Sequence, residues 1–287
     1  CVKIYFLCKY IIMRNELINK LLIIAGSGDY PRLVIEEARI AGVKYIEVLA
    51  FKGETCPKNL KGANNIHWLR VGQLNKMIDS IKQSGINDLM LVGQIAPKNL
   101  FSIRLDNSMK KILHQLPIIN AHTVFTSIID KIEQLGVKVL PAHTFISNNL
   151  PKEGVLSSRA PSVSEIEDIQ HGVDFIKSNS NFDIGQTIAI KKGYVVAIEA
   201  MEGTNATIRR AGKIAGSGTI IAKFPKIGHD FRFDIPVVGP KTIHAMKKAK
   251  STCLGIEAGS TIIFNYDKTI SIANSHDISI IALEAFR

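Results

Sequence analysis

The sequence predicts an α/β protein with two domains, an N-terminal Rossmann-like domain built on a parallel sheet and a C-terminal mixed α/β domain, joined by a hinge. Three observations support this prediction. The chain has 287 residues, and a domain usually takes roughly 100 to 200 residues. Strand and helix patterns alternate through the first half, which is typical of a parallel sheet. Hydrophobic residues make up 46% of the chain, which is enough apolar material for two cores.

The N-terminal domain is predicted over residues 21–146, after a leader or extension at 1–20 to which we assign no function. The apolar run at 21–28 ends in a glycine turn and predicts a strand, and Pro31 fits the first turn of a following helix. The remaining elements alternate in the same way. We expect strands at 45–51, 86–95 and 137–146, and helices at 31–42, 72–85, 106–116 and 121–135.

Residues 147–163 are rich in Ser, Asn, Pro and Gly, which favours a linker, and the C-terminal domain is predicted over 164–287. An apolar stripe predicts a helix at 164–178. Two hairpins are predicted, one at 186–200 and one at 261–273 with Asp267-Lys268 as its turn. The other expected elements are strands at 218–223, 234–238 and 253–257, and helices at 204–213 and 240–250.

The charge of the chain favours anionic partners. Its net charge is +11, and residues 209–250 contain ten basic residues but only two acids. Such a surface attracts phosphates, nucleic acid or an anionic membrane face. No apolar run is long enough to span a membrane, and the four cysteines show no CxxC spacing, so we expect a reducing, cytoplasmic compartment.

A glycine corner follows the first predicted strand at Gly26, Ser27 and Gly28. Backbone N–H groups at such a corner hold a phosphate or carboxylate where a helix begins. The third glycine of a dinucleotide site is missing, and the second strand does not end in an acid, which argues against NAD. A tight strand-to-helix turn explains these residues equally well.

The segment 199–242 combines acids, bases and helix entries in a pattern typical of phosphoryl transfer. Its acids Glu202, Asp230 and Asp234 are ligand types that Mg²⁺ prefers. Its lysines and arginines suit phosphate. If residues 230–234 are extended, both aspartates and the arginine between them share one face, and the two phenylalanines share the other.

Five motifs in the second half carry a resemblance. They are IGQ at 184–186, EGTN at 202–205, RRAG at 209–212, KFPK at 223–226 and HDFRFDIPVVGPKT at 229–242. This set resembles the metal-dependent UDP-2,3-diacylglucosamine pyrophosphatase family, the two-domain type of lipid A biosynthesis rather than the calcineurin-like type. Weaker similarities, the glycine turn, GQL at 72–74 and RAPS at 159–162, extend the resemblance over about residues 21–285.

The resemblance implies Mg²⁺-assisted hydrolysis of UDP-2,3-diacylglucosamine to UMP and 2,3-diacylglucosamine 1-phosphate, in a cleft between the domains. It implies a cytoplasmic enzyme, peripheral at the inner membrane, with this lipid and its product as partners and no nucleic acid. Asp234 and Asp230 are the expected catalytic residues, and Glu202, Asp230 and Asp234 the expected metal ligands. The expected substrate-binding residues are Gly26, Ser27, Gly28, Thr204, Lys223, Lys226, Arg232, Lys241 and Thr242.

One position departs from the family pattern, because Asn205 stands where the family usually has aspartate. Asparagine brings no charge to a metal, but it caps a helix as well as aspartate does, and we favour this capping interpretation. Two other functions stay open. One is a nucleotide-dependent oxidoreductase or transferase that uses the glycine corner. The other is a non-catalytic nucleic-acid-binding protein, which the scarcity of aromatic residues among the bases argues against.

Overall fold

The computed structural model describes residues 18–95, 105–182 and 184–284, so most of the expected leader lies outside the described residues. The chain forms two compact units. The N-terminal unit comprises Cys1–Ile146 together with Phe231–Phe233, and the C-terminal unit comprises Ser147–Asp230 and Asp234–Arg287. The expected linker at 147–163 therefore belongs to the C-terminal unit. No described helix has the length and apolar character needed to cross a membrane.

The N-terminal unit is built on a parallel sheet, as predicted. The sheet has five strands, in the order β3-β2-β1-β4-β5. This is the order of the first five strands of a doubly wound sheet. The edge strand β3 was not expected, because its Ile66 and Trp68 are partly exposed and show no buried run. The strands are β1 (Lys20–Ala25), β2 (Tyr45–Phe51), β3 (Asn65–Leu69), β4 (Asp88–Val92) and the short β5 (Lys138–Val139).

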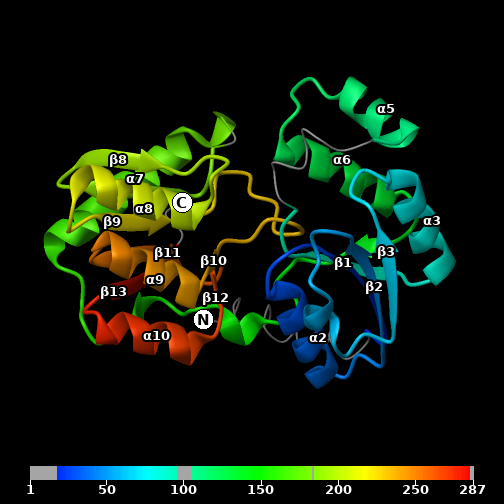
Figure 1. Cartoon of the computed structure of the whole chain (residues 1–287), viewed down its shortest axis with the longest axis horizontal. Helices are drawn as coiled ribbons and strands as arrows, with labels where there is room; N and C mark the ends of the chain where they lie inside the picture. Colours follow the sequence, from blue (N-terminus) through cyan, green and yellow to red (C-terminus); the bar gives the residue numbers. More distant parts are fainter. Residues whose placement is uncertain (1–17, 96–104, 183, 285–287) are drawn as a thin grey trace, which may run out of the picture. The chain divides into compact units, whose positions relative to one another are not determined.

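Four helices pack on this sheet (Figure 1). Alternate side chains of β1, β2 and β4, among them Leu22, Leu49 and Leu89, form one core with three of the helices. Phe233, from the second half of the sequence, also packs against that core. The helices are α2 (Tyr30–Ile40) and the three that share this core, α3 (Leu74–Ser84), α5 (Asn107–Gln115) and α6 (Ala121–Glu133). A short 3-10 helix lies at Pro57–Leu60.

The C-terminal unit is mixed α/β, as predicted. Its main sheet has six strands, in the order β6-β13-β11-β9-β7-β8. Its central strands β13, β11 and β9 are parallel, while β6, β7 and β8 each pair antiparallel with a neighbour. The strands are β6 (Gly154–Val155), β7 (Thr187–Lys191), β8 (Tyr194–Ile198), β9 (Ile220–Lys223), β11 (Cys253–Glu257) and β13 (Ser279–Leu283). A separate pair joins β10 (Val237–Val238) to β12 (Ile262–Ile263).

The two faces of this sheet carry different helices (Figure 1). Helix α7 (Val163–Ser178) packs on one face with Ile188, Ala222 and Cys253. It lies very close to the sheet because Gly172 has no side chain, and a Cβ there would come within 2.6 Å of the Cδ1 of Ile190. The other face carries α8 (Thr204–Ala215), α9 (Pro240–Ala249) and α10 (Tyr266–Ser275). Short 3-10 helices lie at Ser147–Asn149 and Ser180–Phe182.

Two predicted elements are wrong. The expected hairpin at 261–273 is a two-residue strand followed by helix α10. Asn265 takes a left-handed conformation, with φ 47°, and ends the strand, after which Thr269 and Ala273 face the core one helical turn apart. The expected extended segment from Asp230 to Asp234 is a turn, in which the N–H of Asp234 donates to the carbonyl of Asp230 at 3.0 Å.

Candidate active site in the C-terminal unit

The parallel strands of the C-terminal unit end at one edge of the sheet, and helices begin there. Strand β9 ends at Lys223, and Thr204 at the start of α8 contacts it. Helix α9 ends at Ala249, shortly before β11 begins at Cys253 at the opposite edge. The start of α9 therefore lies at the same edge as the end of β9. Open α/β sheets bind ligands beyond the carboxyl ends of their strands. We call this region the carboxyl edge.

A buried lysine is the centre of the carboxyl edge. Lys223 is 6% exposed, and its Nζ donates to the hydroxyl oxygen of Thr204 at 2.9 Å and of Thr187 at 3.3 Å. The Glu199 carboxylate lies 3.9 Å from the ammonium group, and it accepts a hydrogen bond from Thr204 at 3.1 Å. A buried charge needs such partners. Lys223 and Thr204 were predicted. Glu199, the first residue of the segment 199–242, and Thr187, which lies before that segment, were missed as site residues.

Asp234 is held in place by neighbouring side chains but stays open to solvent. The Gln186 amide donates to its Oδ2 at 2.6 Å, and the Nδ1 of His229 lies 3.6 Å from the same oxygen. The Asp234 side chain is 40% exposed. The Oε1 of Gln186 is buried and has no hydrogen-bond partner among the described residues. Gln186 adjoins Thr187 in the chain, so two consecutive residues contact Asp234 and Lys223.

Glu202, just before α8, is engaged by groups close to it in the chain. Its carboxylate accepts hydrogen bonds from Arg210 at 2.6 Å and from the backbone of Ala200 at 3.1 Å. Burial alone would raise the pKa of Glu202, but these bonds hold that pKa below its usual value. Within the described part of the chain, no three His, Cys, Asp or Glu side chains lie close enough together to hold a metal ion. Glu202, Asp230 and Asp234 are therefore not gathered into one site.

Asn205, the residue that departs from the family pattern, does not cap helix α8. The N-cap of α8 is Gly203, and no side chain caps it in the described structure. The capping interpretation of Asn205 is therefore wrong. Its Oδ1 is buried and has no hydrogen-bond partner among the described residues.

Two backbone N–H groups of the glycine corner donate hydrogen bonds within the N-terminal unit. The N–H of Gly26 bonds to the carbonyl of Val92 at 2.8 Å, and the N–H of Ser27 bonds to that of Gln94 at 2.6 Å. A Cβ at Gly26 would lie 2.5 Å from the Gln94 carbonyl oxygen, so glycine is required there. Gly28 takes a positive φ of 87°. The structural role of a tight turn accounts for Gly26 and Ser27, and their N–H groups are not available to a phosphate.

The other predicted substrate-binding residues occupy different settings. Arg232 pairs with Glu133 of the N-terminal unit at 2.9 Å, within the segment that belongs to that unit. Thr242 is buried, and its hydroxyl accepts from the N–H of Gly239 at the start of α9. Lys241 is exposed in the same helical turn, and Lys226 is partly buried just beyond β9.

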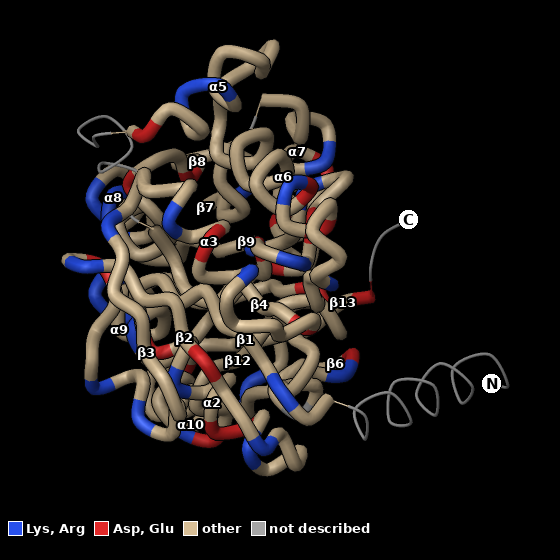
Figure 2. The backbone as a smooth tube through the Cα atoms, turned by 90° about the vertical axis from the view of Figure 1, so that its right-hand side faces the viewer, with Lys and Arg blue, Asp and Glu red and all other residues tan. Residues whose placement is uncertain are grey.

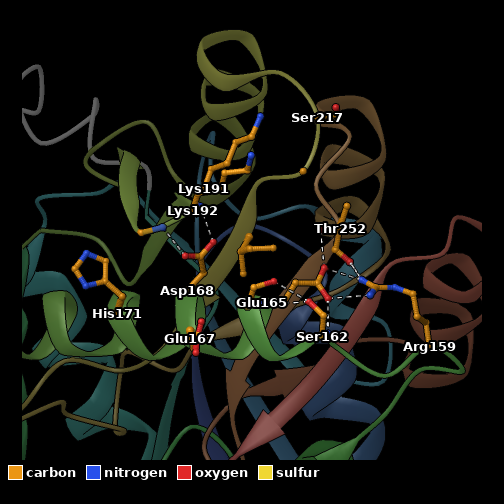
Figure 3. Close-up of a pocket in the computed structure, with 14 residues that line it drawn as sticks. Arg159, Ser162, Glu165, Glu167, Asp168, His171, Lys191, Lys192, Ser217 and Thr252 are labelled. Carbon is orange, nitrogen blue, oxygen red and sulfur yellow. Dashed lines mark hydrogen bonds and ion pairs between the residues drawn. The ribbon is translucent and has the colours of Figure 1, made fainter.

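A hollow of about 810 Å³ lies at the opposite edge of the same sheet, and Figure 3 shows the residues that line it. Its two buried carboxylates, Glu165 and Asp168, are both hydrogen-bonded within the chain. Arg159 bonds both oxygens of Glu165, at 2.8 and 3.0 Å, and Asp168 accepts the backbone N–H groups of Lys192 and Gly193. Burial raises the pKa of Glu165, but the bonds from Arg159, Ser162 and Thr252 outweigh it and lower that pKa to about 2. The carboxylates of this hollow are thus already engaged by the chain itself.

Comparisons with known proteins cover nearly the whole chain. The model of the LpxI N-terminal domain matches residues 20–149, and the model of the LpxI C-terminal domain matches residues 152–281. A curated relative from Caulobacter vibrioides, UDP-2,3-diacylglucosamine pyrophosphatase LpxI, is 24% identical over 280 residues. The alignment spans 93% of this chain and 98% of that protein.

Proposed function

This chain belongs to the LpxI family, and we propose on that basis that it hydrolyses the pyrophosphate bond of UDP-2,3-diacylglucosamine in lipid A biosynthesis. The products are UMP and 2,3-diacylglucosamine 1-phosphate. The observation that carries the proposal is the match of both family domains over residues 20–281 with a single break of two residues. The cluster around Lys223 and Asp234 supports it, because it supplies the charges that this reaction needs.

Groups at the carboxyl edge neutralise the negative charge of the diphosphate in the proposed reaction. Hydrolysis joins a water oxygen to one phosphorus and breaks the bond from that phosphorus to the bridging oxygen, which leaves with the other phosphate. Lys223 supplies a positive charge held in place by Thr204 and Thr187. The first turn of α8 adds backbone N–H groups that no side chain caps in the described structure. Preorganised donors of this kind stabilise the charge that develops on phosphoryl oxygens.

Asp234 is the proposed base. Its carboxylate is partly exposed, so water reaches it, and the hydrogen bond from Gln186 fixes its orientation. In this role it orients the attacking water and accepts its proton. Asp230 follows as the second carboxylate of the same turn.

Mg²⁺ remains part of the proposal. Mg²⁺ is commonly held by one or two carboxylates together with substrate phosphates, and the exposed Asp234 with Asp230 provides that many. Glu202 is a poorer ligand for Mg²⁺ because its carboxylate already accepts a hydrogen bond from Arg210. When bound, the ion would neutralise charge on the diphosphate.

We also propose that the enzyme associates with the inner face of the cytoplasmic membrane through α8 and α9. These two helices pack side by side. Neither helix contains an acidic residue, and basic segments recur along both (Figure 2). Their exposed bases include Arg209, Lys213, Lys247 and Lys248. A basic surface of this kind is attracted to anionic lipid.

The direct test is incubation of the purified chain with UDP-2,3-diacylglucosamine, with Mg²⁺ or with a chelator, followed by detection of UMP. Release of UMP that depends on Mg²⁺ is the expected result. If no UMP forms under either condition, the proposed reaction is wrong. If UMP forms equally in the chelator, only the metal part of the proposal is wrong.

A further inference from the structure

The corner between α5 and α6 carries an exposed apolar tip, which we define as Pro117, Ile118 and Ile119. Ile118 is 63% exposed and Ile119 is 64% exposed, and Pro117 is exposed beside them. Among the exposed large apolar residues of the described chain, these two isoleucines are the only two that are adjacent in sequence. Single exposed apolar residues are normal, whereas a consecutive exposed run indicates a surface that contacts another molecule.

The tip is held in place by the chain on both sides of it. The hydroxyl of Thr123 donates to the carbonyl of Ile118 at 2.7 Å. The side chain of Asn120 accepts the N–H of Thr123 at 2.8 Å and so caps α6. On the other side of the tip, Leu116 packs against the core of the N-terminal unit. Because both ends are anchored, burying the two isoleucines against a partner costs little ordering of the chain.

The segment around the tip is basic. No acidic residue lies between Asp106 and Asp130, a stretch that includes all of α5 and most of α6. Lys110 and Lys111 of α5 are both exposed. An apolar tip beside lysines suits an anionic lipid surface, because the lysines attract the headgroups while the apolar side chains enter the acyl region.

We propose that this tip inserts Ile118 and Ile119 into the surface of an anionic bilayer. The inference rests on the proposed membrane association and adds to it an apolar contact in the N-terminal unit, separate from the basic helices α8 and α9. A second copy of the chain is a poorer occupant, because a stable protein interface takes about 20 residues or more from each side and the tip supplies three. Insertion holds the N-terminal unit at the membrane surface, where a lipid-linked substrate resides.

The test places a fluorescent reporter in the tip. Trp68 is the single tryptophan of the chain, so Trp68→Phe gives a dark background into which Ile119→Trp is introduced. Phosphatidylglycerol vesicles with brominated acyl chains quench an indole that enters the hydrocarbon, and we expect them to quench the Ile119→Trp variant. The matched control is Ile40→Trp in the same background, which we expect to stay bright. Ile40 is 79% exposed, but it ends α2, which lies outside the core shared by α5 and α6.

A second measurement compares binding strengths. Ile118→Asn/Ile119→Asn removes the apolar contact and leaves the lysines, so co-sedimentation with phosphatidylglycerol vesicles should weaken about tenfold or more. Salt screens the attraction of the lysines but not the apolar contact, so the difference between the variant and the unmodified chain should persist in high salt. Thermal melting confirms that each variant is folded.

The outcomes separate this inference from the proposed function. If the unmodified chain binds the vesicles but the Ile119→Trp variant is quenched no more than the control, the tip assignment is wrong and association through α8 and α9 stands. If the unmodified chain does not bind the vesicles, both membrane contacts are wrong, while UMP release still tests the proposed reaction. If the unmodified chain forms a dimer without vesicles and Ile118→Asn/Ile119→Asn abolishes it, the tip is a contact between two copies and the inference is overturned.

Discussion

The side-chain amide of Gln186 donates a hydrogen bond to the Oδ2 of Asp234, with 2.6 Å between the two atoms. Gln186 is 9% exposed, whereas the Asp234 side chain is 40% exposed. A buried donor thus holds a carboxylate that water reaches. This arrangement separates two roles, since Asp234 contacts the reacting atoms in the proposed mechanism and Gln186 positions it.

Replacing Asp234 removes the proposed base. Asp234→Asn keeps the side-chain shape but cannot accept the proton, so we expect kcat to fall about 100-fold or more. The measurement is UMP release under saturating substrate. Asp79→Asn on the exposed face of α3 is the matched control and keeps full activity. An Asp234→Asn enzyme that turns over at the unmodified rate would disprove the assignment.

Gln186→Leu tests positioning without touching the reacting atoms. Loss of the hydrogen bond frees the Asp234 carboxylate to rotate, so we expect kcat to fall about tenfold while KM changes little. Gln186→Asn, which shortens the side chain, should not restore the rate, whereas Gln186→His should restore part of it by supplying another donor. A change confined to KM would contradict a positioning role.

Lys223→Met removes the buried positive charge but keeps much of the side-chain volume. We expect kcat/KM to fall about 100-fold, because phosphate charge then lacks its preorganised partner. The variant also leaves Glu199 without its cation, so the double variant Lys223→Met/Glu199→Gln should be more stable than the single one. Urea unfolding measures this difference. Equal stability of the two variants would mean that the Glu199 charge costs nothing without Lys223, which would contradict this prediction.

The pair of Glu165 and Arg159 makes stability depend on pH. The pKa of Glu165 is lowered to about 2 in the folded chain. The carboxylate therefore stabilises the fold fully above its usual pKa near 4.5, and this stabilisation is lost as pH falls toward 2. Glu165→Gln should lower the free energy of unfolding at pH 7 by about 2 to 3 kcal/mol and remove this part of the acid dependence. Glu167→Gln on the same helix is exposed and serves as the control.

The basic helices α8 and α9 predict binding to anionic vesicles that weakens with salt. Each lysine near such a surface contributes about 1 kcal/mol, so Lys247→Glu/Lys248→Glu should lower vesicle binding about tenfold or more. Co-sedimentation with phosphatidylglycerol vesicles measures it, with Lys82→Glu on the exposed face of α3 as the control. Binding that is insensitive to both salt and the double variant would contradict this surface.

The sequence predicts well where local pattern and tertiary environment agree. Strand β2 at 45–51 and the starts of α8 and α9 are where their apolar patterns and glycine signals place them. The last strand, β13, was missed although it is buried between β6 and β11. The hairpin at 261–273 failed because Asp267-Lys268 carries a turn signal, while the burial of Thr269 and Ala273 selects a helix.

The candidate site was predictable only in part. Lys223, Thr204 and Asp234 belong to motifs, and so do Gln186 and His229 beside Asp234, but Thr187 and Glu199 beside Lys223 do not. Thr187 reaches Lys223, 36 residues later in the chain, because β7 pairs antiparallel with β9. Glu199 comes close to them because β8, which ends just before it, pairs with the other edge of β7. The alternating segment 230–234 suggested a strand, yet its two phenylalanines pack in the N-terminal unit and bend the chain.

The three residues Phe231–Phe233 have a practical consequence for building chimeras within this family. Phe233 stacks on Phe125, Phe231 lies edge-on to His143, and the Phe231 carbonyl accepts the N–H of Ala142. A fragment that stops at Ile146 would lack Phe231 and Phe233 and so would lose all three contacts. Exchanging the N-terminal half between relatives therefore requires grafting this tripeptide along with it.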